Sequence, residues 1–260
     1  MKPIALLIPA YNRHAFLERT LLSLKPELEL LDIILVDDGS VPAIDIAPFA
    51  DYPITLICLA SNQGIARALN KGLEHIFSSG YEFIARLDLD DIALNQRFTK
   101  QLAYLRAHPD IGLVGSWCRD IRSDDSYTER TFPESDQQIR KHMHVRNAFV
   151  HPGIMLRTQV AKQVGFYSEH YPNAEDYEYF FRLLRVCKAH NLPEFLVGYR
   201  WGDAESIGVK NARSQTFSSQ TFSGLRIKLR YFNIAEPQAY RRVIRSVTYL
   251  IWLMLGNKVQ

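Results

Sequence analysis

The sequence lacks the features that mark several common classes of protein. Its 260 residues include only three cysteines, Cys58, Cys118 and Cys187, which lie far apart and form no CxxC pair. We therefore expect neither a disulfide framework nor a cysteine zinc site, and a reducing cytoplasm fits better. No apolar run reaches the ~20 residues that a membrane-spanning helix needs. The N-terminal apolar run breaks at Pro9, so it is a poor signal peptide.

Several nucleotide-binding and hydrolytic motifs are also missing. The chain contains no GxGxxG, GxxxxGK[ST], HExxH or GxSxG sequence. The sequence therefore lacks the motifs typical of dinucleotide-dependent oxidoreductases, P-loop nucleotidases, zinc proteases and serine hydrolases. Any phosphate group that this protein binds must be held by a metal ion and side chains instead.

The composition is that of a folded globular protein with a basic C-terminal extension. Hydrophobic residues make up 47% and charged residues 23% of the chain, and the net charge is +3. That charge is unevenly spread, because residues 210–260 carry nine lysines and arginines but a single acidic residue, Glu236. We predict one body over residues 1–208 and a helical, basic and apolar extension over residues 209–260.

The extension has two interpretations. Its longest apolar stretch, residues 247–255, is too short to span a bilayer but could lie in a membrane interface beside its arginines. Alternatively, the extension packs on the body as a C-terminal helix. A nucleic-acid partner is not expected, because the positive charge lies beside an apolar run and no reading module is recognisable.

Short apolar runs alternate with segments of helical periodicity. The apolar runs predict strands at residues 4–8, 32–36, 54–59, 83–87, 111–115, 153–157 and 194–199. The periodic segments predict helices at residues 14–24, 64–77, 95–107, 135–144 and 176–187, and residues 119–133 read as a hairpin or loop. Because the strands are apolar throughout, helices should cover both faces of the sheet. The order predicts an α/β fold with a mostly parallel central sheet flanked by helices.

Five carboxylates follow two of the predicted strands. Asp37 and Asp38 end the second strand, and Asp88, Asp90 and Asp91 follow the fourth. Ligands bind at the carboxyl ends of strands in open α/β sheets, and carboxylates gathered there repel one another unless a cation is present. Oxygen ligands suit Mg²⁺ or Mn²⁺. The alternative is that aspartate and glycine merely form the turns after these strands.

An ordered set of short motifs resembles the family 2 inverting glycosyltransferases of the GT-A fold. The matching pieces are PAYN at 9–12, VDDGS at 36–40, NQGIARALNKG at 62–72, ARLDLDD at 85–91, HPG at 151–153 and EDYE at 175–178. Each piece is weak alone, but the ordered set is specific, and the resemblance covers roughly residues 3–200 of the chain. It implies a nucleotide-binding half over about residues 1–117 and an acceptor-binding half over about residues 118–208.

The resemblance implies a site for a nucleotide and a divalent cation. Asp90, together with Asp88, would ligate Mn²⁺ or Mg²⁺ between the two phosphates of the donor, and Asp88 would also contact the ribose. The residues implied in nucleotide binding are Pro9, Tyr11, Asn12, Asp37, Asp38, Gly64, Arg67 and Asp88.

The resemblance also implies residues for the sugar and the chemistry. Asp176 would be the catalytic base, with Glu175 beside it on acceptor or donor hydroxyls, although acidic residues here also favour the first turn of a helix. Asp91 would lie near the donor sugar. His151 would lie on the acceptor side or near the metal, or serve only the His-Pro-Gly turn. Trp201 would stack on a sugar or belong to the core.

These features together predict a non-processive enzyme. Arg200 and Trp201 match the end of the QxxRW motif of processive relatives, but Val197 stands in place of its glutamine. The expected reaction moves one sugar, most simply from a UDP-sugar, to a glycan or lipid-linked glycan during lipopolysaccharide, O-antigen or capsule synthesis. It would take place in the cytoplasm or at the inner face of its membrane. The alternative is a non-catalytic nucleotide-sugar sensor or scaffold on the same fold.

Overall fold

The computed structural model describes residues 1–200 and 216–231. Within them one sheet of nine strands runs in the order β3-β2-β1-β4-β8-β6-β9-β5, and β7 pairs with β6. The strands are β1 (Ile4–Ala10), β2 (Leu31–Asp37), β3 (Ile54–Cys58), β4 (Phe83–Arg86), β5 (Ile92–Ala93), β6 (Ile111–Ile121), β7 (Tyr127–Arg130), β8 (Met155–Arg157) and β9 (Lys188–Arg200). The α-helices are α1 (His14–Leu24), α2 (Ile65–Ser78), α3 (Arg97–Ala107), α4 (Asp136–Met143), α5 (Thr158–Val164), α6 (Glu175–Val186) and α8 (Thr216–Arg230).

The first half of the sheet is parallel, as the sequence predicts. Strand β1 pairs in parallel with β2 and β4, and β2 pairs in parallel with β3. The register of β1 against β2 runs from Ile4 opposite Leu31 to Ala10 opposite Asp37. The carboxyl ends of these strands therefore meet at one edge, which brings the loop after β1 close to the aspartates after β2 and β4.

The second half of the sheet is mixed rather than mostly parallel. Strand β8 is antiparallel to both β4 and β6, whereas β6 and β9 run parallel to each other. Strand β5 joins from the first half and pairs antiparallel with β9, and β7 forms a hairpin with β6. The hairpin agrees with the prediction for residues 119–133.

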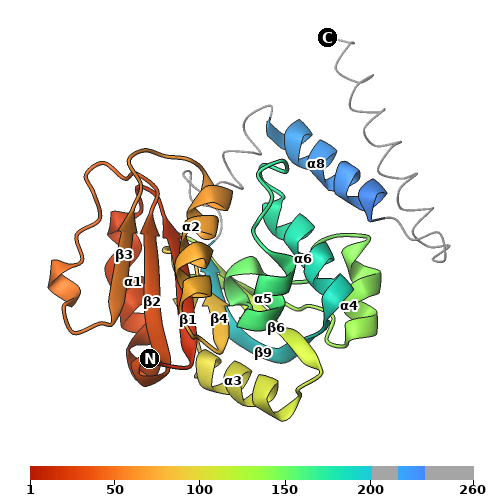
Figure 1. The fold of residues 1–260 in the computed structure, drawn as a ribbon, viewed down its shortest axis with the longest axis horizontal. Helices are drawn as coiled ribbons and strands as arrows, with labels where there is room; N and C mark the ends of the chain where they lie inside the picture. The colour runs from red at the N-terminus through yellow and green to blue at the C-terminus, as the bar shows by residue number, and fades with distance from the viewer. Residues whose placement is uncertain (201–215, 232–260) are drawn as a thin grey trace, which may run out of the picture.

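Helices cover both faces of the sheet, as the unbroken apolar strands predict (Figure 1). On one face, Leu7 and Val36 pack with α2, α4, α5 and α6. On the other face, Leu6 and Ile8 pack with α1 and α3. Each fully buried Leu or Ile stabilises the fold by roughly 1.5–3 kcal/mol, so alternate residues of one strand hold both layers against the sheet.

The C-terminal extension is described only over α8 and Tyr231, and this part packs on the body beside α6 (Figure 1). Ile227 is fully buried, and the Tyr231 ring stacks on Phe181 at 5.2 Å between centroids. The hydroxyl of Tyr231 donates a 2.7 Å hydrogen bond to Glu178. Residues 201–215 and 232–260, including the predicted apolar stretch, lie outside the described residues. In the part of the chain that is described, no helix has the length and apolar character to cross a bilayer.

Candidate active site

A cleft of about 730 Å³ opens at the carboxyl ends of β1, β2 and β4. Six parts of the chain form it: the loop after β1, the loop after β2, the start of α2 with its preceding loop, the loop after β4, residues 168–175, and the end of β9. The lining includes nine of the predicted site residues, namely Pro9, Tyr11, Asn12, Asp38, Gly64, Arg67, Asp88, Asp90 and Glu175. Segments far apart in the sequence thus meet around a single volume.

The two aspartates after β2 have different roles in this geometry. Asp38 lines the cleft, and its carboxylate accepts hydrogen bonds from the backbone amides of Gln63 (2.8 Å) and Gly64 (2.9 Å). Asp37 lies outside the cleft lining, because its carboxylate turns inward to the amides of Ser40 (2.9 Å) and Ile44 (3.1 Å). Asp37 therefore holds the turn after β2.

A glycine conformation brings this loop close to the start of α2. Gly39 has a φ of +73°, and a Cβ placed on it would lie 2.5 Å from the backbone carbon of Ser61. Only glycine fits this approach without a backbone shift. The close contact is what lets Asp38, the next residue back, reach the amides before α2.

The first turn of α2 faces the cleft. Gly64 precedes the helix with a φ of +90°, and a Cβ there would meet no atom within 4 Å. Arg67, in the first turn, pairs with Glu169 at 2.7 Å, and both side chains are about half exposed. The partial positive charge of a helix N-terminus adds to that of Arg67, so this wall of the cleft favours an anion.

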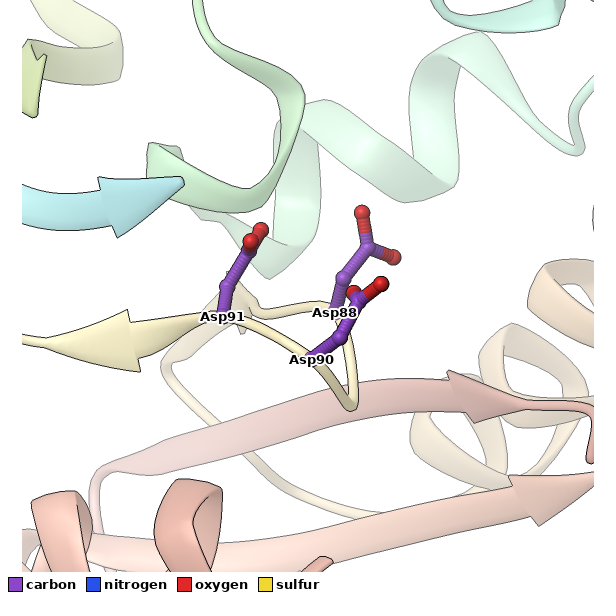
Figure 2. A group of neighbouring side chains, drawn as sticks. All are labelled: Asp88, Asp90 and Asp91. Carbon is purple, nitrogen blue, oxygen red and sulfur yellow. The ribbon is translucent and has the colours of Figure 1, made fainter. Parts of the chain in front are cut away.

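The three aspartates after β4 form a compact cluster (Figure 2). Each offers a carboxylate oxygen, and these oxygens all lie within 4.8 Å of one another. Asp88 pairs with the buried Arg86 at 2.5 Å, and Asp90 pairs with Arg13 at 3.5 Å. Asp91 is buried behind the cleft lining, where one oxygen accepts a 2.7 Å hydrogen bond from the backbone amide of Arg200.

Crowding of these carboxylates changes their acidity. Burial, followed by the charge of Asp88, raises the pKa of Asp90 to about 6. Burial and the charges of Asp90 and Asp88 raise the pKa of Asp91 well above its ordinary value. The second oxygen of Asp91 is buried and has no hydrogen-bond partner within residues 1–200 and 216–231. An orphaned oxygen among three close carboxylates fits a hard divalent cation such as Mg²⁺ or Mn²⁺.

A second pair of carboxylates begins α6. Glu175 lines the cleft and is 8% exposed, and one of its carboxylate oxygens has no hydrogen-bond partner in the part of the chain that the structure describes. Burial, followed by the charge of Asp176, raises the pKa of Glu175 to about 7. Asp176 accepts hydrogen bonds from the side-chain amide of Asn147 (2.8 Å) and from the amide of Tyr177 (2.7 Å), and burial raises its pKa. The N-cap of α6 is Ala174, which has no capping side chain, and the bond from Tyr177 means that Asp176 also satisfies an amide in the first turn of the helix.

Of the remaining predicted residues, Asp176 and His151 are not part of the cleft lining. His151 is buried, and its Nε2 lies 2.9 Å from the hydroxyl of Tyr167. Burial, followed by the charge of Arg86, lowers the pKa of His151 well below its ordinary value, so the ring is neutral. Trp201 lies outside the described residues.

Sequence reasoning passed over several residues that shape this site. Arg86 lies inside the ARLDLDD motif and Arg13 directly follows the PAYN motif, but neither is assigned a role from the sequence. Asn70 lies in the NQGIARALNKG motif and has no assigned role there, yet its side chain makes two hydrogen bonds to the backbone of Tyr167, at 2.8 and 3.0 Å. Those bonds fix the segment that carries Glu169, and no local sequence pattern reports a contact over such a separation.

Comparison with known proteins agrees with this geometry. Residues 5–165 match the family model described as Glycosyl transferase family 2. The chain is 31% identical over 255 residues to the amylovoran biosynthesis glycosyltransferase AmsE of Erwinia amylovora, a match that covers 95% of this chain and 94% of AmsE. The family match includes the loops after β1, β2 and β4 and the start of α2, and it ends before residues 168–175 and the end of β9, which also line the cleft.

Solved structures with low sequence identity share the fold. Residues 1–349 of S. aureus TarS, solved in complex with UDP-GlcNAc, superpose with a TM-score of 0.65 at 16% identity, covering 95% of this chain and 72% of that one. A longer TarS structure is covered over only 41% of its length. The mannosyltransferase PcManGT of Pyrobaculum calidifontis, solved with GDP-Man and Mn²⁺, gives a TM-score of 0.62 at 16% identity, covering 95% of this chain and 69% of that one. With the family match spanning more than half of its residues, the chain belongs to glycosyl transferase family 2 and has the GT-A fold.

Proposed function

We propose that this protein moves one sugar from a UDP-sugar to a hydroxyl group of a glycan, with inversion at the anomeric carbon and release after a single transfer. The observation that carries the proposal is the cleft, whose lining brings together Arg67 at the start of α2, Asp88 and Asp90 of the aspartate cluster, and Glu175 at the start of α6. The TarS structure with UDP-GlcNAc and the PcManGT structure with GDP-Man support a nucleotide-sugar donor.

The nucleotide would occupy the side of the cleft formed by β1, β2 and α2. Tyr11 is 45% exposed there, so its ring is available to a base. Both oxygens of Asp38 already accept backbone hydrogen bonds, but a carboxylate retains further lone pairs for a base N–H group. Arg67 would exchange Glu169 for a phosphate, and Asp88 would contact the ribose.

The aspartate cluster would hold Mn²⁺ or Mg²⁺, chiefly through Asp90 with Asp88. Bound there, the ion would supply charge neutralisation to the departing nucleoside diphosphate. One buried oxygen of Asp91 has no donor among the described residues, which supports the assignment because burying such an oxygen without a donor costs free energy. PcManGT, solved with Mn²⁺, supports it further.

The carboxylates of α6 would perform the proton transfer. Asp176 would take the proton from the acceptor hydroxyl as the new bond to the anomeric carbon forms and the bond to the phosphate oxygen breaks. Its raised pKa makes it a stronger base than a solvated aspartate, and Asn147 holds its orientation. Glu175 would contact hydroxyls of the donor or acceptor. Attack from the face opposite the leaving group inverts the centre in one displacement.

The acceptor would be a growing glycan or a lipid-linked glycan at the inner face of the cytoplasmic membrane. The name of AmsE, which refers to amylovoran biosynthesis, supports a role in polysaccharide assembly, with lipopolysaccharide, O-antigen and capsule as the candidate products. Within α8, Arg226, Leu229 and Arg230 are exposed, which suits contact with an anionic surface. Flotation of the full chain with anionic and with neutral liposomes tests this contact. If the protein floats with neither kind of liposome, the contact is refuted.

Calorimetry tests the central proposal. UDP, GDP, CDP and dTDP are titrated into the protein with Mn²⁺ and again with EDTA. We expect UDP to bind with Mn²⁺ and to bind at least tenfold more weakly with EDTA. NMR of the product anomeric configuration then tests inversion. Absence of binding by every nucleotide to folded protein would contradict the proposal.

A further inference from the structure

Arg13 occupies an unusual place beside the aspartate cluster. It follows the loop after β1, immediately before α1, and it lines the cleft. Its guanidinium lies 3.5 Å from a carboxylate oxygen of Asp90, and the two side chains are 16% and 19% exposed. The guanidinium carbon also lies 5.7 Å from the centre of the Phe16 ring. Arg13 is thus placed where it can be reached from the cleft.

Arg86, the other arginine that pairs with the cluster, differs in this respect. Its side chain is only 4% exposed and contacts Asp88 at 2.5 Å from within the protein. Arg86 does not line the cleft, and leaving Asp88 would require it to move through packed atoms. Arg86 therefore stays paired with Asp88, whereas Arg13 can leave Asp90 and pair with an anion that enters the cleft.

Arg13 and a divalent cation would compete for the same carboxylate. Asp90 is the proposed metal ligand, and Arg13 already neutralises part of its charge. A nucleoside diphosphate carries several negative charges that attract a guanidinium strongly, often through two hydrogen bonds. A diphosphate in the cleft would therefore draw Arg13 from Asp90 and leave that carboxylate to the cation.

We propose that Arg13 is a positioning residue that holds Asp90 until the donor arrives and then transfers to its diphosphate, which makes cation binding depend on nucleotide binding. The inference rests on the proposed function, in which the cluster binds Mn²⁺ or Mg²⁺ together with a nucleoside diphosphate. The proposal predicts that the two ligands bind cooperatively. UDP raises the affinity of the protein for Mn²⁺, and by linkage Mn²⁺ raises its affinity for UDP by the same factor. Arg13 supplies part of that coupling.

Electron paramagnetic resonance of free Mn²⁺ tests the proposal, with the wild type and two neutral variants, Arg13→Met and Arg13→Gln. Without UDP, we expect each variant to bind Mn²⁺ about tenfold more tightly than the wild type, because the competing charge is gone. The increase in Mn²⁺ affinity caused by UDP should shrink by a similar factor. Arg13→Lys should restore most of the coupling. Arg19→Met is the matched control, because Arg19 lies on α1 and pairs at 2.8 Å with Asp125, which does not line the cleft.

The outcomes separate the two proposals. If the wild type binds Mn²⁺ with UDP but the neutral variants bind Mn²⁺ alone no more tightly, the role of Arg13 is refuted and the proposed site remains. If the wild type binds no Mn²⁺ with any nucleoside diphosphate, the proposed function itself fails. Circular dichroism checks that each variant is folded. Two different neutral variants are used so that the comparison can still be made if one of them misfolds.

Discussion

The raised pKa of Glu175 allows a quantitative prediction, because a buried group that titrates in the folded protein makes the free energy of unfolding depend on pH. Its pKa rises from 4.5 to about 7 in the folded protein. As the pH rises, the unfolded state therefore loses this proton at a lower pH than the folded state. The free energy of unfolding of the wild type should decrease as the pH rises from 4.5 to 7. The difference of roughly 2.5 pKa units corresponds to about 3 kcal/mol. Glu175→Gln removes the ionisation and should remove this loss.

Urea unfolding at pH 4.5 and pH 8 measures the effect. At pH 4.5 we expect similar stability for the wild type and Glu175→Gln, and at pH 8 we expect the variant to be more stable by about 3 kcal/mol. Glu74→Gln is the control, because Glu74 is half exposed in a surface pair with Lys71 and should change stability by less than about 1 kcal/mol. A stability difference that does not grow with pH would refute the argument that burial raises this pKa.

Three further changes test other parts of the site. Gly39→Ala forces a side chain into a conformation with φ of +73° and 2.5 Å from Ser61, so urea unfolding should show a loss of about 2 kcal/mol or more, and calorimetry weaker UDP binding. Asp176→Asn should lower turnover by roughly 10²–10⁴-fold in a UDP-release assay while UDP binding persists; unchanged turnover would favour the sensor. Asn70→Ala removes both bonds to Tyr167, at a cost of about 1–3 kcal/mol, and should speed hydrogen exchange in residues 165–174.

Local patterns in the sequence predicted the elements that depend on local physics. The α1 bounds agree at both ends, and the helices α2, α3, α4 and α6 agree to within two residues. Their apolar stripes face the sheet, so periodicity alone is enough to place them. The apolar runs of β1, β2 and β4 were also predicted, because each of these strands is buried on both faces. The edge strand β3 was predicted from its apolar run as well, although it is only partly buried.

Elements fixed by distant partners were harder to predict. The sequence did not indicate β5, which has two residues and exists because β9 pairs with it. Helix α5 is seven residues long, too short for a clear periodic signal, and the first part of β9 is too polar to resemble a buried strand.

The site shows the same division between local and distant control. The acidic motifs located the cluster of Asp88, Asp90 and Asp91, because adjacency in the chain keeps those residues together. Sequence order did not reveal which carboxylates turn inward. Asp37 and Asp38 are neighbours, yet one holds a turn and the other lines the cleft. That choice depends on which backbone amides are within reach.

The path of β6 and β9 bears on how this enzyme could be re-engineered. The predicted border between a nucleotide half and an acceptor half, near residue 117, falls inside β6, a continuous strand from Ile111 to Ile121. Strand β5, from the nucleotide half, is hydrogen-bonded to β9 of the other half. A chimaera joined at that border would take β6 partly from each parent. It would also pair β5 from one parent with β9 from the other. Recombination between relatives should therefore exchange the loops around the cleft and leave the sheet from a single parent.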